Sequence, residues 1–99
     1  MTLNEILQDL HALETRLREY EARYGVASAD FYELYQQGML DNDGLEQTIE
    51  FTRWASAYEM KLEREKAFRQ MSRRFISSLR AQTAPGALRL TPNPELHKA

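Results

Sequence analysis

The chain has 99 residues, of which 42% are hydrophobic, and this length allows one small hydrophobic core rather than two. It contains no cysteine, which excludes disulfide bonds, thiolate metal ligands and thiol nucleophiles. The net charge of −2 conceals an uneven distribution. Residues 1–60 hold twelve carboxylates against four arginines, a charge of −8, whereas residues 61–99 hold nine Lys or Arg against three Glu, a charge of +6. This polarity predicts either two surfaces that bind different partners or head-to-tail attraction between copies of the chain.

Two further absences concern the cellular compartment. The N-terminal segment has no basic region followed by an apolar core, and no window approaches the roughly 18 consecutive apolar residues of a membrane-spanning helix. Together with the lack of cysteine, these features predict a soluble, cytoplasmic protein without a membrane partner.

Residues 3–24 are predicted to form the first helix. Thr2 and Glu5 have the spacing of a capping box, in which the two side chains bind free amide groups at a helix start. Gly25 can adopt the left-handed conformation that ends a helix. Apolar residues recur between them at steps of three and four, which places one apolar stripe on the helix: Leu3, Ile6, Leu10, Leu13, Leu17, Tyr20 and Tyr24. Packing within a small bundle is favoured over an intermolecular coiled coil, because three heptads are few for the latter.

A short second helix is predicted at about residues 29–37. Ser28 and Asp30 are suitable capping residues at its start, and Gly38 is suitable at its end. The segment 41–44 then concentrates residues that favour turns, and it is followed by a new helical pattern. We expect this short helix to lie across the two longer ones.

Residues 45–82 are predicted to form one long helix, because they contain neither proline nor glycine. Its expected apolar face begins with Leu45, Ile49, Thr52, Tyr58 and Leu62, with Phe51 and Trp54 beside it. At 1.5 Å per residue the helix would be roughly 57 Å long, against roughly 33 Å for helix 3–24. The predicted fold is therefore all-α, an antiparallel hairpin or small bundle spanning residues 1–82, with an extended last helix.

The overhang of the long helix is the main candidate for a binding surface. Its apolar residues would stay exposed on a monomer, which predicts an interface with a protein partner and a homo-oligomer, a dimer or larger, when that partner is absent: Phe68, Met71, Phe75, Ile76 and Leu79. Residues 83–99 contain three prolines and are predicted to form a flexible tail. Trp54 is a further candidate, as a partner anchor, although most aromatic residues of so small a protein should belong to its core.

No pattern for catalysis, metal binding or cofactor binding is recognised. The two histidines, His11 and His97, lack companions at zinc-ligand spacing, and no serine lies in a nucleophile motif. The acidic segment 41–44 lacks the remaining ligands of a calcium loop. We therefore expect a protein that is not an enzyme and that needs no metal or cofactor.

Basic residues accompany the apolar stripe of the overhang, and they could contact an acidic protein or a nucleic acid: Arg64, Arg69, Arg73, Arg74 and Arg80. A protein partner is favoured, because the chain as a whole is acidic and two glutamates dilute the start of this segment.

The central sequence YEARYGVASADFYELYQQGMLD, followed by Glu50-Phe51 and Trp54-Ala55, resembles small helical prokaryotic antitoxins of toxin–antitoxin pairs. The resemblance covers about residues 17–60, and residues 61–99 lie outside it. It implies a protein that neutralises a co-encoded toxin by direct binding, with a DNA-binding role left open. Two alternatives remain: a homo-oligomeric coiled-coil scaffold, and a nucleic-acid-binding protein that uses the basic helix 64–80.

Overall fold

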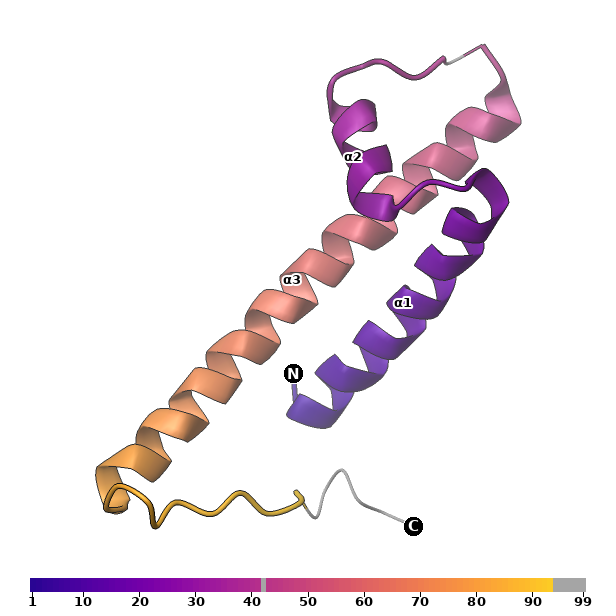
Figure 1. The fold of residues 1–99 in the computed structure, drawn as a ribbon. Coiled ribbons are helices and arrows are strands. Elements are labelled where there is room, and N and C mark those ends of the chain that lie inside the picture. The colour runs from indigo at the N-terminus through magenta and orange to yellow at the C-terminus, as the bar shows by residue number, and fades with distance from the viewer. Residues whose placement is uncertain (42, 94–99) are drawn as a thin grey trace.

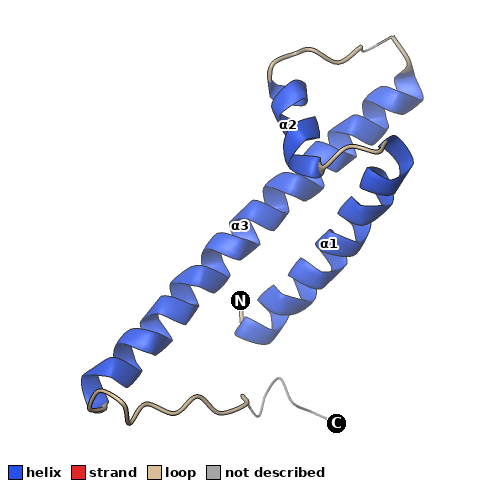
Figure 2. Ribbon diagram, viewed as in Figure 1, coloured by secondary structure: helices blue, strands red, loops and turns tan. Residues whose placement is uncertain are grey.

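The computed structural model describes residues 1–41 and 43–93, and the regular secondary structure within these residues is helical. It consists of α1 (Leu3–Tyr24), α2 (Ser28–Gln36) and α3 (Leu45–Gln82) (Figures 1 and 2). The all-α prediction is confirmed. The predicted bounds of α1 and α3 agree with the structure, and α2 begins and ends one residue earlier than predicted.

The three helices form an elongated molecule with extents of 60 × 32 × 24 Å. α1 runs antiparallel to α3, and α2 packs against the first part of α3 near the C-terminal end of α1 (Figure 1). The second half of α3 extends past the N-terminus of α1. Residues 83–93 have no helix or strand and turn back toward α1, while the rest of the predicted flexible tail, including His97, lies outside the described residues.

Both ends of α1 have the predicted geometry. Thr2 Oγ1 accepts a hydrogen bond from the Glu5 N–H at 3.2 Å, and the Thr2 N–H donates to Glu5 Oε1 at 3.1 Å, which completes the capping box. Gly25 has a φ of +67°, and its N–H donates to the Glu21 carbonyl oxygen at 2.8 Å. A residue with a side chain is disfavoured at that φ, so glycine ends the helix here.

The start of α2 differs from the prediction. Ala27 is the capping residue, and no side chain of α2 itself binds the free amide groups of its first turn. Instead, the carboxylate of Glu21 in α1 accepts a hydrogen bond from the Ser28 N–H at 2.9 Å. The predicted cap by Ser28 was wrong because its hydroxyl is occupied: it accepts a hydrogen bond from Trp54 in α3.

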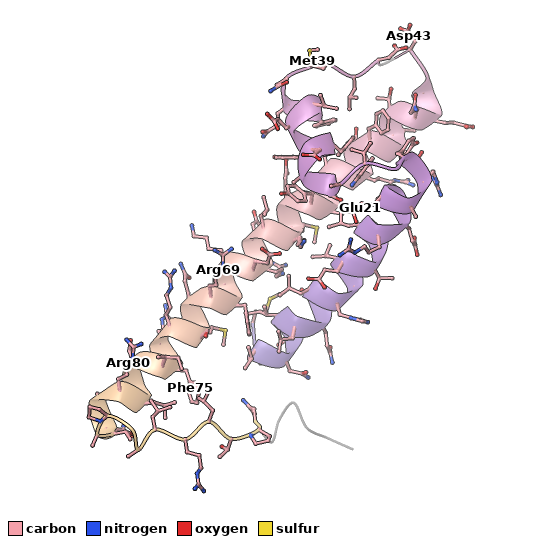
Figure 3. The ribbon with its side chains drawn as sticks, viewed as in Figure 1. Glu21, Met39, Asp43, Arg69, Phe75 and Arg80 are labelled. Carbon is pink, nitrogen blue, oxygen red and sulfur yellow. The ribbon has the colours of Figure 1, made fainter. Side chains whose placement is uncertain are left out.

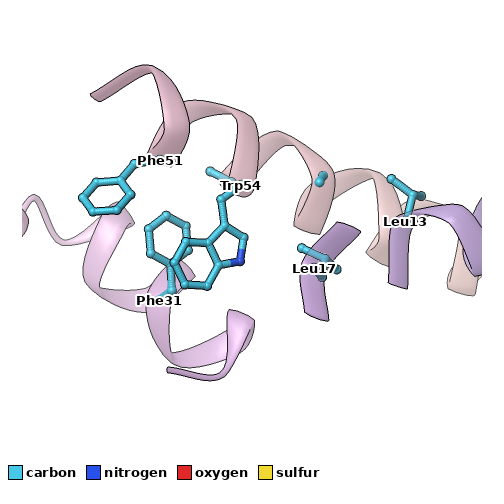
Figure 4. Close-up of a cluster of buried hydrophobic side chains, with 7 residues drawn as sticks. Leu13, Leu17, Phe31, Phe51 and Trp54 are labelled. Carbon is cyan, nitrogen blue, oxygen red and sulfur yellow. The ribbon is translucent and has the colours of Figure 1, made fainter. Parts of the chain in front are cut away.

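The core lies where all three helices meet, and Trp54 is at its centre (Figure 4). Its indole is 1% exposed and stacks on Phe31, with ring centroids 3.8 Å apart and planes 4° from parallel. Tyr20 and Tyr24 of α1 stack on it with centroids 5.4 and 5.5 Å away. Stacked rings add about 0.5–1.5 kcal/mol per pair to the effect of burial alone, so this cluster holds the helices together.

The buried face of α3 is rotated from the predicted one. Leu45, Ile49 and Leu62 are 76%, 43% and 41% exposed, whereas Trp54 and Ala55 are buried. The prediction gave too much weight to aliphatic residues. An aromatic side chain buries 150–250 Å², so the helix turns its rings inward, and small alanines beside them let α1 and α2 approach closely.

Candidate protein-binding surface

An apolar groove lies where the N-terminus of α1 meets the second half of α3, and its volume is about 420 Å³. Leu3 and Leu7 are one turn apart on α1, and they face side chains that recur at helical spacing on α3. Ser72 and Asn93 supply polar groups to the lining, the latter from the loop that follows α3. The full lining is Leu3, Leu7, Phe68, Met71, Ser72, Phe75 and Asn93.

The predicted apolar patch is only partly exposed. Phe75 is 59% exposed and lies on the side of α3 that faces the loop 83–93 (Figure 3), but Phe68 and Met71 are half-buried. Ile76 and Leu79 are also half-buried and do not line the groove. The expectation that this chain leaves its overhang uncovered was therefore wrong in part, because the first turns of α1 reach Phe68 and Met71.

The predicted basic residues fall into two groups. Arg64 Nε donates to Asp9 Oδ2 at 3.1 Å and so joins α3 to α1, and Arg69 pairs with Glu65 at 3.7 Å. Arg73, Arg74 and Arg80 are exposed, and no ion pair engages them within residues 1–41 and 43–93. Of the predicted basic residues, these three have no ion-pair partner in the described residues.

A second depression, of about 400 Å³, lies along α3 and combines cations with one apolar side chain. Its lining is Leu62, Lys66, Arg69, Gln70 and Arg73. Arg69 projects away from α1 (Figure 3). Three cationic side chains around an apolar one suit a surface with both carboxylates and apolar groups.

The structure rules out Trp54 as a partner anchor. Its indole is 1% exposed and its Nε1–H already donates to Ser28. A partner could reach the ring only if the core opened. Trp54 is buried by three aromatic residues that α1 and α2 contribute. The sequence pattern of α3 alone could not reveal these neighbours.

The opposite end of the molecule also exposes apolar side chains, from α2, the following loop and the first turns of α3: Leu34, Tyr35, Met39, Leu45 and Ile49. Charges of both signs lie beside them, since Ile49 lines one depression with Glu46, Glu50, Arg23 and Arg53. Glu50 is bound to Arg23 and accepts a 2.6 Å hydrogen bond from the Tyr24 hydroxyl, but Asp43 and Glu46 are exposed. The sequence indicated that this half of the chain is acidic, but it did not indicate that these apolar side chains are exposed.

Two groups at helix contacts have shifted pKa values. Burial alone raises the pKa of Glu21, but the hydrogen bonds from Ser28, aided by the charges of Arg18 and Lys61, outweigh it and lower that pKa below its ordinary value of 4.5. The pKa of the Tyr32 hydroxyl is raised, chiefly because it donates a 2.7 Å hydrogen bond to Glu59. Both groups serve helix packing and lie outside the groove.

Two features are absent from the described residues. Within residues 1–41 and 43–93, no three His, Asp or Glu side chains are grouped so that they could hold a metal ion. None of the helices in the same residues has the length and apolar character needed to cross a membrane.

Sequence reasoning missed Leu7 as part of the groove, since Leu7 lies outside the stripe assigned to α1. Its position four residues after Leu3 was the available signal, because residues at that spacing share a helix face.

Comparison with known proteins adds nothing to this geometry: no protein-family model, curated protein or solved structure matches the chain significantly.

Proposed function

We propose that this protein is a non-catalytic, cytoplasmic binding module of the antitoxin type, which neutralises a partner protein through the groove at the protruding end of α3. The observation that carries the proposal is the exposure of Phe75 beside the apolar groove formed with Leu3 and Leu7. Large exposed aromatic residues next to apolar hollows are typical of the residues that dominate protein–protein affinity.

The surroundings of the groove favour a partner with acidic side chains. Arg73 and Arg74 adjoin Phe75 in sequence, and both are exposed. Charged groups at the rim of an interface increase the association rate and discourage partners of the wrong charge. A partner that inserts an apolar side chain beside Phe75 and presents carboxylates to these arginines would match both features.

The base of the groove is formed before binding. Phe68 and Met71 lie on a continuous 38-residue helix, and they are half-buried because the first turns of α1 pack beside them. A surface held in place before binding loses less conformational entropy on association than a flexible one.

The test is co-expression of the tagged chain with the product of the reading frame beside its gene, followed by mass measurement of the intact purified complex. Phe75→Glu should weaken the complex about 100-fold or more, because a carboxylate would be buried against apolar groups. Met60→Glu is the matched control, since Met60 is 44% exposed and lies away from the groove. Equal binding by the wild type and Phe75→Glu, or no complex with the neighbouring product, would contradict the proposal.

Nucleic-acid binding is a second candidate, favoured by the exposure of Arg73, Arg74 and Arg80. A protein that neutralises three phosphates loses roughly 40-fold in affinity between about 50 and 200 mM salt. Titration of a labelled duplex at both salt concentrations would detect it, and Arg73→Gln with Arg74→Gln should reduce the salt slope. Binding that stays weak at the lower concentration excludes this candidate.

A further inference from the structure

One segment at an end of the molecule carries only negative charge, although Arg23 and Arg53 flank it and line a depression together with Glu46 and Glu50. We call residues 24–52 the acidic head: they comprise α2, the loop after it and the start of α3, and they contain no lysine or arginine. Its six carboxylates give it a charge of −6: Asp30, Glu33, Asp41, Asp43, Glu46 and Glu50. Of these, Glu50 is neutralised by Arg23 within the same chain.

The other end carries only positive charge. We call residues 66–93 the basic end: they comprise the protruding part of α3 and the loop after it, and they contain no aspartate or glutamate. Its six cations give it a charge of +6: Lys66, Arg69, Arg73, Arg74, Arg80 and Arg89. Of these, Arg69 pairs with Glu65 just outside the basic end.

The two ends cannot meet within one molecule. They lie at opposite ends of a rod that is 60 Å long, and the straight helix α3 holds them apart (Figure 1). Charges this far apart are screened almost completely, because the Debye length is about 8–10 Å at physiological ionic strength. Their complementarity is available only to another molecule.

We infer that a second copy of this chain binds antiparallel to the first, so that the acidic head of each copy contacts the basic end of the other. A parallel arrangement would place like charges together at both ends, whereas the antiparallel arrangement forms two equivalent attractive contacts. Such a pair has twofold symmetry and closes on itself, which yields a dimer rather than a filament. This inference goes beyond the proposed function, because it concerns the isolated chain and adds the acidic head as a second surface, while the basic end is shared with the proposed function.

Apolar side chains at both ends add to the contact. In the acidic head, Met39 and Leu45 are 70% and 76% exposed, and in the basic end Phe75 and Leu90 are 59% and 67% exposed. Burying apolar area stabilises association by roughly 25 cal/mol per Å², and the charges select the register. Apolar groups and complementary charges therefore coincide at the two surfaces that the antiparallel pair brings together.

The test is charge reversal at each end, followed by sedimentation at about 100 μM protein and about 20 mM salt, where the Debye length is about 20 Å. The head variant carries Glu33→Lys with Glu46→Lys, and the end variant carries Arg73→Glu with Arg74→Glu. All four side chains are exposed, so the helices should persist, and circular dichroism checks this. The wild type should be dimeric, and each variant alone should dimerise at least about 10-fold more weakly.

An equimolar mixture of the two variants is the decisive sample. Its heterodimer pairs a reversed head with a reversed end, and a native end with a native head, so dimerisation should return. A control variant with Glu14→Lys and Glu63→Lys has the same net charge as the head variant but alters neither end. It should form homodimers alone. It should not form heterodimers with the end variant, because one of the two contacts would remain repulsive.

Three outcomes would overturn the inference: a wild type that remains monomeric under these conditions, a mixture of head and end variants that stays monomeric, or assemblies larger than dimers. The proposed function is tested separately, because Phe75→Glu is judged by binding of a different protein. A wild type that binds the partner but does not self-associate refutes only this inference, and a wild type that self-associates but does not bind the partner refutes only the proposed function.

Discussion

The indole Nε1–H of Trp54 donates a hydrogen bond to the hydroxyl oxygen of Ser28 at 2.9 Å, and both residues are buried. This bond joins the first third of α3 to the first residue of α2. The backbone N–H of the same serine donates to Glu21 of α1, so one residue links all three helices. Two hydrogen bonds that fix α2 are thus made by a residue only four positions after the last residue of α1.

Ser28→Ala should lower the free energy of unfolding by about 1–3 kcal/mol, because the buried indole N–H loses its acceptor. The cost should be much smaller in a Trp54→Phe background, where no donor is left unsatisfied. Urea denaturation of the four proteins in this double-mutant cycle measures the coupling between the two residues. Additive effects would show that the hydrogen bond contributes little.

Glu21 should give the protein an acid-sensitive component of stability. Its pKa is lowered in the folded state, so its contribution is fully present above the ordinary value of 4.5 and is lost as the pH falls through the lower folded value. Glu21→Gln keeps an oxygen that can accept from the Ser28 N–H but removes the charge. The difference in stability between wild type and variant should therefore shrink below about pH 4.5.

Unfolding experiments across pH 3–7 measure this difference, with Glu14→Gln as the matched control on the same helix. Glu14 is exposed and lies seven residues before Glu21, two turns farther from α2. A gap between wild type and Glu21→Gln that is constant with pH would contradict the role assigned to this carboxylate.

Gly25 should tolerate substitution poorly although space surrounds it. No atom lies within 4 Å of an added Cβ, but the residue has a φ of +67°. Gly25→Ala should therefore cost about 1–2 kcal/mol through the backbone alone, and Gly25→Asn should cost less, since asparagine adopts this conformation more readily. Thermal or urea unfolding of both variants tests the order, and equal stability of the alanine variant and wild type would refute it.

The ion pair between Asp9 and Arg64 should contribute little to stability despite joining distant parts of the sequence. Their side chains are 42% and 25% exposed, and pairs in such positions are worth less than about 1 kcal/mol. Asp9→Asn should change the free energy of unfolding by less than that amount. A loss of more than about 2 kcal/mol in the free energy of unfolding would contradict this prediction, because it would show that solvent screens the pair only weakly.

The helices could be predicted because their signals are local. The Thr2 and Glu5 capping box, the left-handed Gly25 and the uninterrupted segment 45–82 each depend on residues within a few positions of one another. The residues that determine each helix end lie close together in the sequence, so the predicted bounds agree closely with the structure.

The packing was harder to predict, because it depends on which faces meet. Nothing local indicates that Ser28 binds Trp54 rather than capping its own helix, since the partner is 26 residues away. Likewise, the stripe at Phe68 and Phe75 was visible in the sequence, but the cover supplied by Leu3 and Leu7 follows from how far α1 extends along α3. The groove is therefore a tertiary property of two separately predictable helices.

α3 is one continuous helix whose two halves have unequal support. Phe51 and Trp54 in its first half are packed by both α1 and α2, whereas Phe75 in its last third is largely exposed. Backbone amides should therefore exchange with deuterium along a gradient, slowly near Trp54 and faster turn by turn toward Gln82. A bound molecule at the protruding end would slow exchange there most, so the amides of this helix report both that binding has occurred and how far along α3 it extends.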